Sequence, residues 1–271
     1  MASDVEAFAD SVNAVTQAMP VPAAWTPDRP CDDRAEHLHD ALEDIGWLDL
    51  AEEPEALEFI ASGAVELGRA LAPLSTVDAL LGGSPAAGSL VRYAQEGEAA
   101  VVAGSYGPVL KRISQAHPVA YADALAVHRF ATDPAGIEEP VGPQRTTAWI
   151  TANVGYLAGL CDGATRIAIE HADQRIAFGK PLTAIEAVAH KLADARTISD
   201  GLLLAAAHDP SPDVLAYAGP AACAVTAHCH QVVGAIGFTL EFPLQRYSRR
   251  AKALHLWNDS ALTTLTCQEA A

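Results

Sequence analysis

The chain has 271 residues, half of them hydrophobic, which is enough for one large domain or two small ones with a substantial core. Its 34 acidic and 17 basic residues give a formal net charge of −17. Such a charge repels nucleic acid and anionic membranes and restricts any phosphate site to a local basic patch. Aromatic residues make up only 6% of the chain, and alanine is abundant, which favours packed helices over a β-sandwich.

Residues 1–96 are expected to be helical. The segment 35–50 places Leu38, Leu42 and Ile45 on one helical face, and 57–71 repeats the pattern until Pro73 ends it. Residues 97–145 change character, with short strand-like runs bounded by Gly, Pro and Asp. This middle segment is too short for an independent sandwich, so we expect two to four strands packed on the helices.

From Thr146 onward the pattern is helical again. Two long helices are indicated by apolar stripes, at Ile150, Val154, Leu157, Cys161, Ala164 and Ala168, and at Ile185, Val188, Leu192, Ala195, Ile198 and Leu202. A third helix is expected over 214–233, with Gly219-Pro220 inside it, and a fourth over 244–257. Four such helices joined by short corners predict an antiparallel bundle over 146–260, within a C-terminal domain of 146–271.

The segment 214–240 contains no charged residue and is long enough to span a bilayer. Gly219-Pro220, the polar residues after it and several alanines favour a buried helix followed by a glycine turn instead. The acidic N-terminus lacks the basic region of a signal peptide. The cysteines are scattered without a CxxC pair, so we expect reduced thiols in a cytoplasmic protein. They are Cys31, Cys161, Cys223, Cys229 and Cys267.

The corner between the first two bundle helices carries more than a reversal needs. Gly179 and Pro181 are sufficient to turn the chain, yet Arg175 and Phe178 stand beside them. A guanidinium matches phosphate oxygens, and an aromatic ring offers a face to a flat ligand. The alternative is that Arg175 only stabilises the C-terminus of its helix.

Two other groups of residues have simpler interpretations. Cys223, His228, Cys229 and His230 are close in sequence, but residues two apart on a helix diverge, so packing is favoured over a metal site. A basic cluster attracts phosphates or pairs with the acidic excess, and pairing is favoured. Its members are Arg246, Arg249, Arg250 and Lys252.

Two long stretches, RIAFGKPLTAIEAVAHKLAD and HQVVGAIGFTLEFPLQRYSRRAKAL, resemble the C-terminal helical domain of the acyl-CoA dehydrogenases, flavoproteins that oxidise the Cα–Cβ bond of acyl-CoA thioesters. LEDIGWLDL and AVELGRALAPL resemble, more weakly, the family's N-terminal helical domain. The resemblance implies a mainly α, acyl-CoA dehydrogenase-like fold: an N-terminal helical region (1–96), a reduced β segment (97–145) and a C-terminal four-helix bundle domain (146–271).

The resemblance also implies a cofactor site for FAD. In the family, the Arg-x-x-Phe corner reaches the pyrophosphate and adenine end of FAD, often FAD seated on a neighbouring subunit. By resemblance, Arg175 and Phe178 are FAD contacts. Gln231 and Gly234 match a second FAD stretch, where glycine lets the backbone approach phosphate closely.

The sequence departs from the family at the general base. Many members carry a glutamate nine residues after the first arginine of the basic helix, where this chain has Asn258. An amide cannot take a proton, and the adjacent Asp259 is turned about 100° away on a helix. Other members place the base early in the first bundle helix, but AWITANVG has no acid. Glu186 and Glu241 match no known base position. The middle segment also lacks the family's Thr-Glu-Pro-x-x-Gly-Ser stretch.

These features predict a subunit of a heteromeric, FAD-dependent acyl-CoA dehydrogenase, a heterotetramer in which a paralogous partner supplies the flavin-ring site and the base. Short subunits of this kind in the family act on steroid-derived acyl-CoAs, which implies lipid and steroid catabolism. Two alternatives remain open: a scaffold subunit without FAD, and a stand-alone acyl-CoA dehydrogenase with a displaced base.

Overall fold

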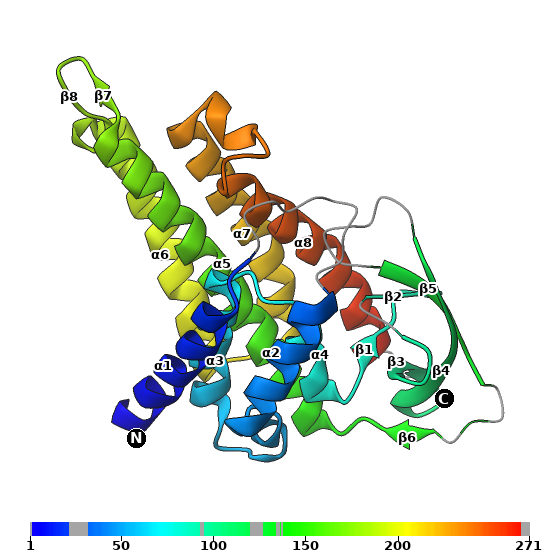
Figure 1. Ribbon diagram of the computed structural model, residues 1–271. Helices are drawn as coiled ribbons and strands as arrows, with labels where there is room; N and C mark the ends of the chain where they lie inside the picture. Colours follow the sequence, from blue (N-terminus) through cyan, green and yellow to red (C-terminus); the bar gives the residue numbers. More distant parts are fainter. Residues whose placement is uncertain are drawn as a thin grey trace.

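The structure, a computed structural model, describes residues 2–21, 32–92, 95–119, 127–133, 136 and 138–266. Cys31 and Cys267 lie outside this part of the chain, as does much of the strand-like run 119–130. The described helices pack around one long central helix, and a sheet lies beside them (Figure 1).

The four bundle helices are α5 (Pro143–Gln174), α6 (Glu186–His208), α7 (Pro212–Val233) and α8 (Leu244–Thr266). Helix α5 contacts the other three, and short connections reverse the chain between successive helices (Figure 1). The bundle predicted from the apolar stripes is therefore confirmed. Helix α5 begins before the expected Thr146, because proline at the first helical position lacks an N–H that would be left unpaired there. Helix α8 continues past the expected end at Trp257.

Helix α5 is buried on all sides, not on one stripe. Every residue from Ala148 to Thr165 is buried, since α3 (Leu57–Arg69) covers the face that the bundle leaves free. Small residues allow the two backbones to approach closely. A Cβ on Gly159 would overlap the carbonyl of Val65, and one on Gly68 would overlap the carbonyl of Tyr156.

We expect Gly159→Ala to lower the free energy of unfolding by about 1–3 kcal/mol, because the added methyl group meets backbone that cannot move without separating α3 from α5. Gly201→Ala in α6 is the matched control, since its Cβ would meet nothing within 4 Å. Gly201→Ala should raise the free energy of unfolding by about 0.4–1 kcal/mol. Urea unfolding measures both. Equal effects would contradict the close helix contact.

The described residues of the N-terminal region form helices up to residue 81, as expected. The region contains α1 (Ala2–Ala18), α2 (Asp32–Asp44), η1 (Asp49–Glu52), α3, α4 (Ser75–Asp78) and η2 (Ala79–Leu81). The buried carboxylate of Asp162 in α5 joins this region to the bundle. It accepts from Arg69 Nε of α3 at 2.5 Å and from Arg196 Nη1 of α6 at 2.6 Å.

The sheet has the strand order β1-β3-β4-β5-β2, with β6 paired to β4. The strands are β1 (Ser84–Pro85), β2 (Leu90–Arg92), β3 (Ala99–Gly104), β4 (Gly107–Pro118), β5 (Val127–Thr132) and β6 (Glu139–Pro140). Four of them fall within 97–145, in the expected number. Among the described strands, β1 and β3 are the one parallel pair. Helix α8 contacts β1, β3 and β4, and Thr264 Oγ1 donates to the carbonyl of Ala86 at 2.7 Å.

The expectation that residues 1–96 are helical throughout is wrong at β1 and β2. These strands are two and three residues long, too short to show an alternating pattern in sequence. They form because their backbones pair with strands from later in the chain: Pro85 lies opposite Val101, and Val91 opposite His128. The division of the chain into three parts stays a prediction.

The uncharged segment 214–240 is not one helix. Helix α7 ends at Val233, and a 3-10 turn, η4 (Ala235–Phe238), follows Gly234. Across the described ranges, no helix combines the length and apolarity that a bilayer crossing requires.

Candidate functional site

The corner between α5 and α6 is a small β-hairpin that extends beyond the bundle (Figure 1). Strands β7 (Ile176–Ala177) and β8 (Lys180–Pro181) pair across a two-residue turn of Phe178 and Gly179. Both turn residues have positive φ, +53° and +77°, which is the pattern of a tight hairpin turn with a right-handed twist.

Phe178 combines two unfavourable features at this turn, a positive φ and an exposed aromatic ring. Bulky side chains rarely adopt positive φ, because Cβ crowds the backbone. The ring is also 94% exposed, so no packing within this chain compensates for the strain. Strained residues that persist in a fold concentrate at functional sites. The hairpin therefore presents a strained aromatic ring at the surface of the chain.

Arg175 stands at the base of the hairpin as the C-cap of α5. Its backbone N–H donates to the carbonyl of His171 at 3.0 Å, and its carbonyl accepts from Leu182 at 3.0 Å. These are main-chain contacts. Among the described residues, none pairs with the Arg175 guanidinium. The backbone thus ends the helix, and the side-chain charge remains available for a ligand.

Gln231 and Gly234 lie at the same end of the bundle as the hairpin, because α7 ends where α5 ends (Figure 1). The rings of His171 in α5 and Phe242 in the α7–α8 connection meet edge to face at 5.9 Å, which ties the two corners together. Gly234 has φ +80° and ψ −155°, a conformation open essentially to glycine alone. A Cβ there would meet nothing within 4 Å, so its backbone faces open space.

A cavity of about 420 Å³ lies between α7 and α8 beside Gln231. Its lining includes Lys252 and His230. The Nε2 of His230 is 2.9 Å from Ser248 Oγ. The ring of Phe238 stacks on His230 at 4.2 Å while remaining exposed on its other side. Burial lowers the pKa of His230, so the cavity holds a neutral imidazole at neutral pH.

The Cys and His residues of α7 do not form a metal site within the described residues. Cys223 and Cys229 carry free thiols. Burial raises the pKa of Cys229 to about 11 and raises that of Cys223 as well. Thiols with raised pKa are protonated and unreactive at neutral pH. The packing interpretation of this group stays a prediction.

Sequence relatives are found among the acyl-CoA dehydrogenases, although no family model matches the chain. The mitochondrial short-chain specific enzyme of Sus scrofa is 28% identical over 117 aligned residues, covering 38% of this chain and 28% of that enzyme. The short-chain specific enzyme of Megasphaera elsdenii is 29% identical over 111 residues, covering 36% and 29%. The matches thus span less than a third of these curated relatives.

Similar solved structures cover nearly the whole chain. Butyryl-CoA dehydrogenase from Megasphaera elsdenii superposes with a TM-score of 0.70 at 13% identity, over 96% of both chains. A variant of the Tcur3481–Tcur3483 steroid ACAD gives 0.69 at 17% identity, over 96% of this chain and 97% of that one. The ChsE4–ChsE5 complex from Mycobacterium tuberculosis gives 0.65 at 16%, over 95% and 93%.

The chain has the acyl-CoA dehydrogenase fold.

Within this fold, the position at which a base is expected is occupied by a buried amide. Asn258 is 1% exposed, and neither of its amide atoms has a hydrogen-bond partner among the described residues. It lies inside α8, which runs without a break to Thr266. Thus no loop presents a carboxylate here. Asp259, one residue on, is exposed and lies 3.8 Å from His255 Nδ1.

Two other charged candidates from the sequence, Glu186 and Arg250, have contacts within the chain. Glu186 opens α6 as a highly exposed side chain 3.9 Å from His190. Within the basic cluster of α8, Arg250 turns inward and donates to the carbonyl of Ala72 at 3.0 Å and to the hydroxyl of Tyr156 at 2.9 Å. Arg250 therefore connects α8 to the N-terminal region instead of facing a phosphate.

Sequence reasoning missed one polar cluster altogether. Asp78 and Arg92 form an ion pair in the interior, with Arg92 fully buried. The two residues lie far apart in sequence on a short helix and a three-residue strand. No periodic pattern links them, so only the folded arrangement could reveal the pair.

Proposed function

We propose that the chain is a subunit of a heteromeric, FAD-dependent acyl-CoA dehydrogenase that catalyses α,β-dehydrogenation of an acyl-CoA. In this proposal the chain contributes the adenosine-diphosphate end of the FAD site through Arg175, Phe178, Gln231 and Gly234. A paralogous partner, paired with it in a cytoplasmic heterotetramer, contributes the flavin-ring site and the catalytic base. The steroid ACAD among the similar structures favours a steroid-derived acyl-CoA as substrate.

The observation that carries the proposal is the α5–α6 hairpin. Its tip carries a strained aromatic ring, 94% exposed, and its base carries a guanidinium with no partner among the described residues. The two groups match the two ends of an adenosine diphosphate. The guanidinium fork suits pyrophosphate oxygens, and the ring suits a flat base. The chain's net charge of −17 makes this local cation necessary, because the rest of the surface repels a diphosphate.

The residues of the second corner fit the same group. Gly234 exposes its backbone with no side chain in the way, which allows a phosphate or ribose to approach closely. Gln231 is exposed at the mouth of the 420 Å³ cavity and carries both a donor and an acceptor. FAD, when bound, accepts the hydride from the substrate. This chain's residues bind and orient the far end of the cofactor.

Proton removal must come from another source. Asn258 has no lone pair basic enough to take an α-proton, and it is buried away from solvent. A partner carboxylate meets this need, and an exposed apolar surface provides a place for the partner. Large hydrophobic side chains are exposed at the hairpin and at the α7–α8 connection, on the end of the bundle that carries the proposed FAD residues. They are Ile176, Phe178, Ile236, Phe238 and Leu240.

We expect the chain to bind little or no FAD when purified alone and to hold stoichiometric FAD when co-expressed with a longer acyl-CoA dehydrogenase encoded beside it. In the proposal this chain contacts only the adenosine-diphosphate end of FAD. Without the partner's contacts to the flavin ring, the chain alone should bind FAD much more weakly than the complex does. Absorbance at the flavin bands, measured per protein mass on both preparations, tests this.

Each alternative has its own outcome in the same experiment. If the chain alone is yellow, holds one FAD and turns over an acyl-CoA, it is a stand-alone enzyme with a displaced base. If it forms the complex but its corner residues do not affect FAD binding, it is a scaffold subunit. Either result rejects the proposal.

A further inference from the structure

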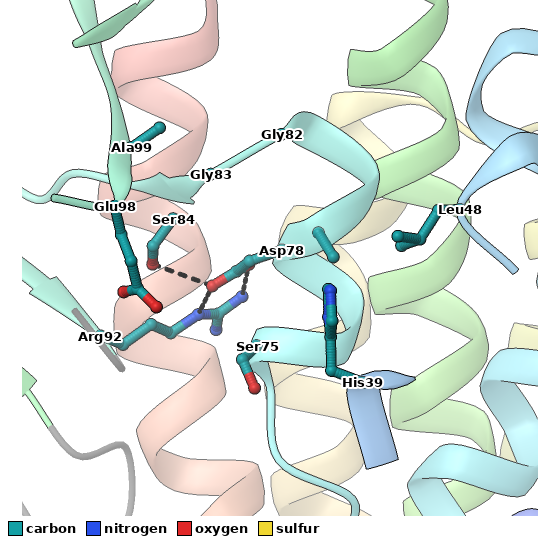
Figure 2. A pocket seen from close by; sticks show the side chains of 11 residues that line it. His39, Leu48, Ser75, Asp78, Gly82, Gly83, Ser84, Arg92, Glu98 and Ala99 are labelled. Atoms are coloured by element: carbon teal, nitrogen blue, oxygen red, sulfur yellow. Dashed lines mark hydrogen bonds and ion pairs between the residues drawn. The ribbon is translucent and has the colours of Figure 1, made fainter. Parts of the chain in front are cut away.

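A second cavity, of about 380 Å³, lies between α2, α4 and the first strands of the sheet (Figure 2). Its lining is mainly small or apolar, with Leu48, Ala79 and Ala99 among its walls. Its volume is within the range of small-molecule sites, about 300–1,000 Å³.

This cavity is far from the proposed FAD site. Trp149, which contacts the Asp78 carboxylate of this cavity, lies near the start of α5, and Arg175 lies at the end of the same helix. At 1.5 Å per residue the two regions are roughly 40 Å apart along the helix.

One side of this cavity is a rigid polar network centred on Asp78. The carboxylate accepts from Arg92 Nε at 2.7 Å and Arg92 Nη2 at 2.5 Å. It also accepts from Ser84 Oγ and from Trp149 Nε1, both at 2.9 Å. Four donors satisfy both carboxylate oxygens and fix the plane of the guanidinium. Figure 2 draws the contacts from Ser84 and Arg92.

Two polar atoms of the lining remain without partners. The side-on pairing with Asp78 uses Nε and Nη2 of Arg92, which leaves Nη1 directed away from the carboxylate. Arg92 is fully buried, and no described residue accepts from its Nη1. The hydroxyl of Ser75, on the same cavity, is likewise buried without a partner. A buried donor without a partner destabilises the fold, and an occupant with an acceptor atom would relieve that cost.

The charges around the cavity decide which acceptor fits. Asp78 neutralises Arg92, and Glu98 adds a carboxylate to the lining, so a second anion would meet net repulsion. A cation finds no free acceptor at Asp78, whose oxygens already accept four donors. The Glu98 carboxylate is exposed to solvent and accepts from the Gln95 backbone N–H at 2.7 Å, so it does not supply a dry, free acceptor either. We propose that this cavity binds an uncharged, mainly apolar molecule whose single carbonyl or hydroxyl oxygen accepts from Arg92 Nη1 and Ser75 Oγ.

Three probes with the same ring system test this in the full chain: trans-1-decalone, trans-decalin and trans-decalin-1-carboxylate, each titrated by calorimetry. The ketone should bind at least about tenfold more tightly than the hydrocarbon, because a hydrogen bond to a charged donor is worth about that much. The carboxylate should bind more weakly than the ketone. Equal binding of ketone and hydrocarbon, or tighter binding of the carboxylate, would overturn the proposal, as would no binding of the ketone.

Two substitutions locate the site. Ser75→Ala should weaken ketone binding about threefold to tenfold and leave the hydrocarbon unchanged. Ala79→Leu fills the cavity from a half-buried wall position and should abolish binding of both probes. Ala193→Leu, at an exposed position of α6, is the matched control and should bind them like the parent chain. Ketone binding that survives Ala79→Leu would place the ligand elsewhere and reject the site.

Discussion

Replacing Arg92 by alanine is expected to lower the free energy of unfolding by about 3–5 kcal/mol, because it leaves the Asp78 carboxylate buried without its charge partner. Both side chains are almost completely enclosed, with exposures of 0% and 4%. Ser84 and Trp149 would still donate to the carboxylate, but two neutral donors cannot replace a guanidinium. Urea unfolding monitored by circular dichroism measures the loss.

The surface pair of Arg145 and Glu52 provides the control. It joins α5 to η1, with Arg145 Nε 2.6 Å from Glu52 Oε1, but the two side chains are 34% and 60% exposed. Arg145→Ala should cost no more than about 1 kcal/mol, since water replaces the lost partner. The double change of Arg92→Met with Asp78→Leu should recover much of the stability lost in Arg92→Ala, because it removes the unpaired charge. A cost below about 1 kcal/mol for Arg92→Ala would mean that water reaches Asp78.

The second large effect concerns FAD. In the complex with its partner, Arg175→Ala should weaken FAD binding by roughly tenfold to a hundredfold, because a charge-assisted contact is worth about 1.5–3 kcal/mol. Arg175→Lys should recover only part of the affinity, since an ammonium lacks the planar fork. The chain's stability should hardly change, because the side chain is exposed and contacts no described partner. FAD titration of the purified complex measures the affinity.

Arg112→Ala on β4 is the matched control for this substitution. It removes an exposed arginine that donates to the carbonyl of Gly97 and lies on the sheet, away from the hairpin (Figure 1). FAD affinity should be unaffected there. If Arg175→Ala binds FAD as the parent complex does, the hairpin does not bind the cofactor, and Arg175 serves only to end its helix.

The parts of the fold that sequence could predict are those governed by periodicity. The stripe from Ile150 to Ala168 and the stripe from Ile185 to Leu202 each identified a bundle helix, since core packing imposes the helical repeat. Periodicity could not show that α5 is enclosed on every side. Most of its additional buried residues are small or polar, such as Gly155, Ala158 and Thr165, and these carry little hydrophobic signal.

The candidate site divides in the same way. Arg175 and Phe178 stood out because a turn needs neither residue type, which can be read from sequence. The resemblance to the acyl-CoA dehydrogenases then suggested FAD as their ligand. The positive φ of Phe178 could not be read, because a turn type depends on backbone geometry that Phe does not favour. The Asp78–Arg92 pair was equally hidden, since its strand exists only through pairing with β5.

The burial of α5 limits where this fold can vary. Between Ala148 and Thr165 every side chain has neighbours on all sides, so a change in volume there is transmitted to α3 or to the bundle. The two ends of the helix are not restricted in this way. One carries the hairpin with Arg175, and the other leads to Asp78 and the second cavity. A fold organised around this buried helix can gain or lose a binding site at either end of the helix while the packing of its middle stays the same.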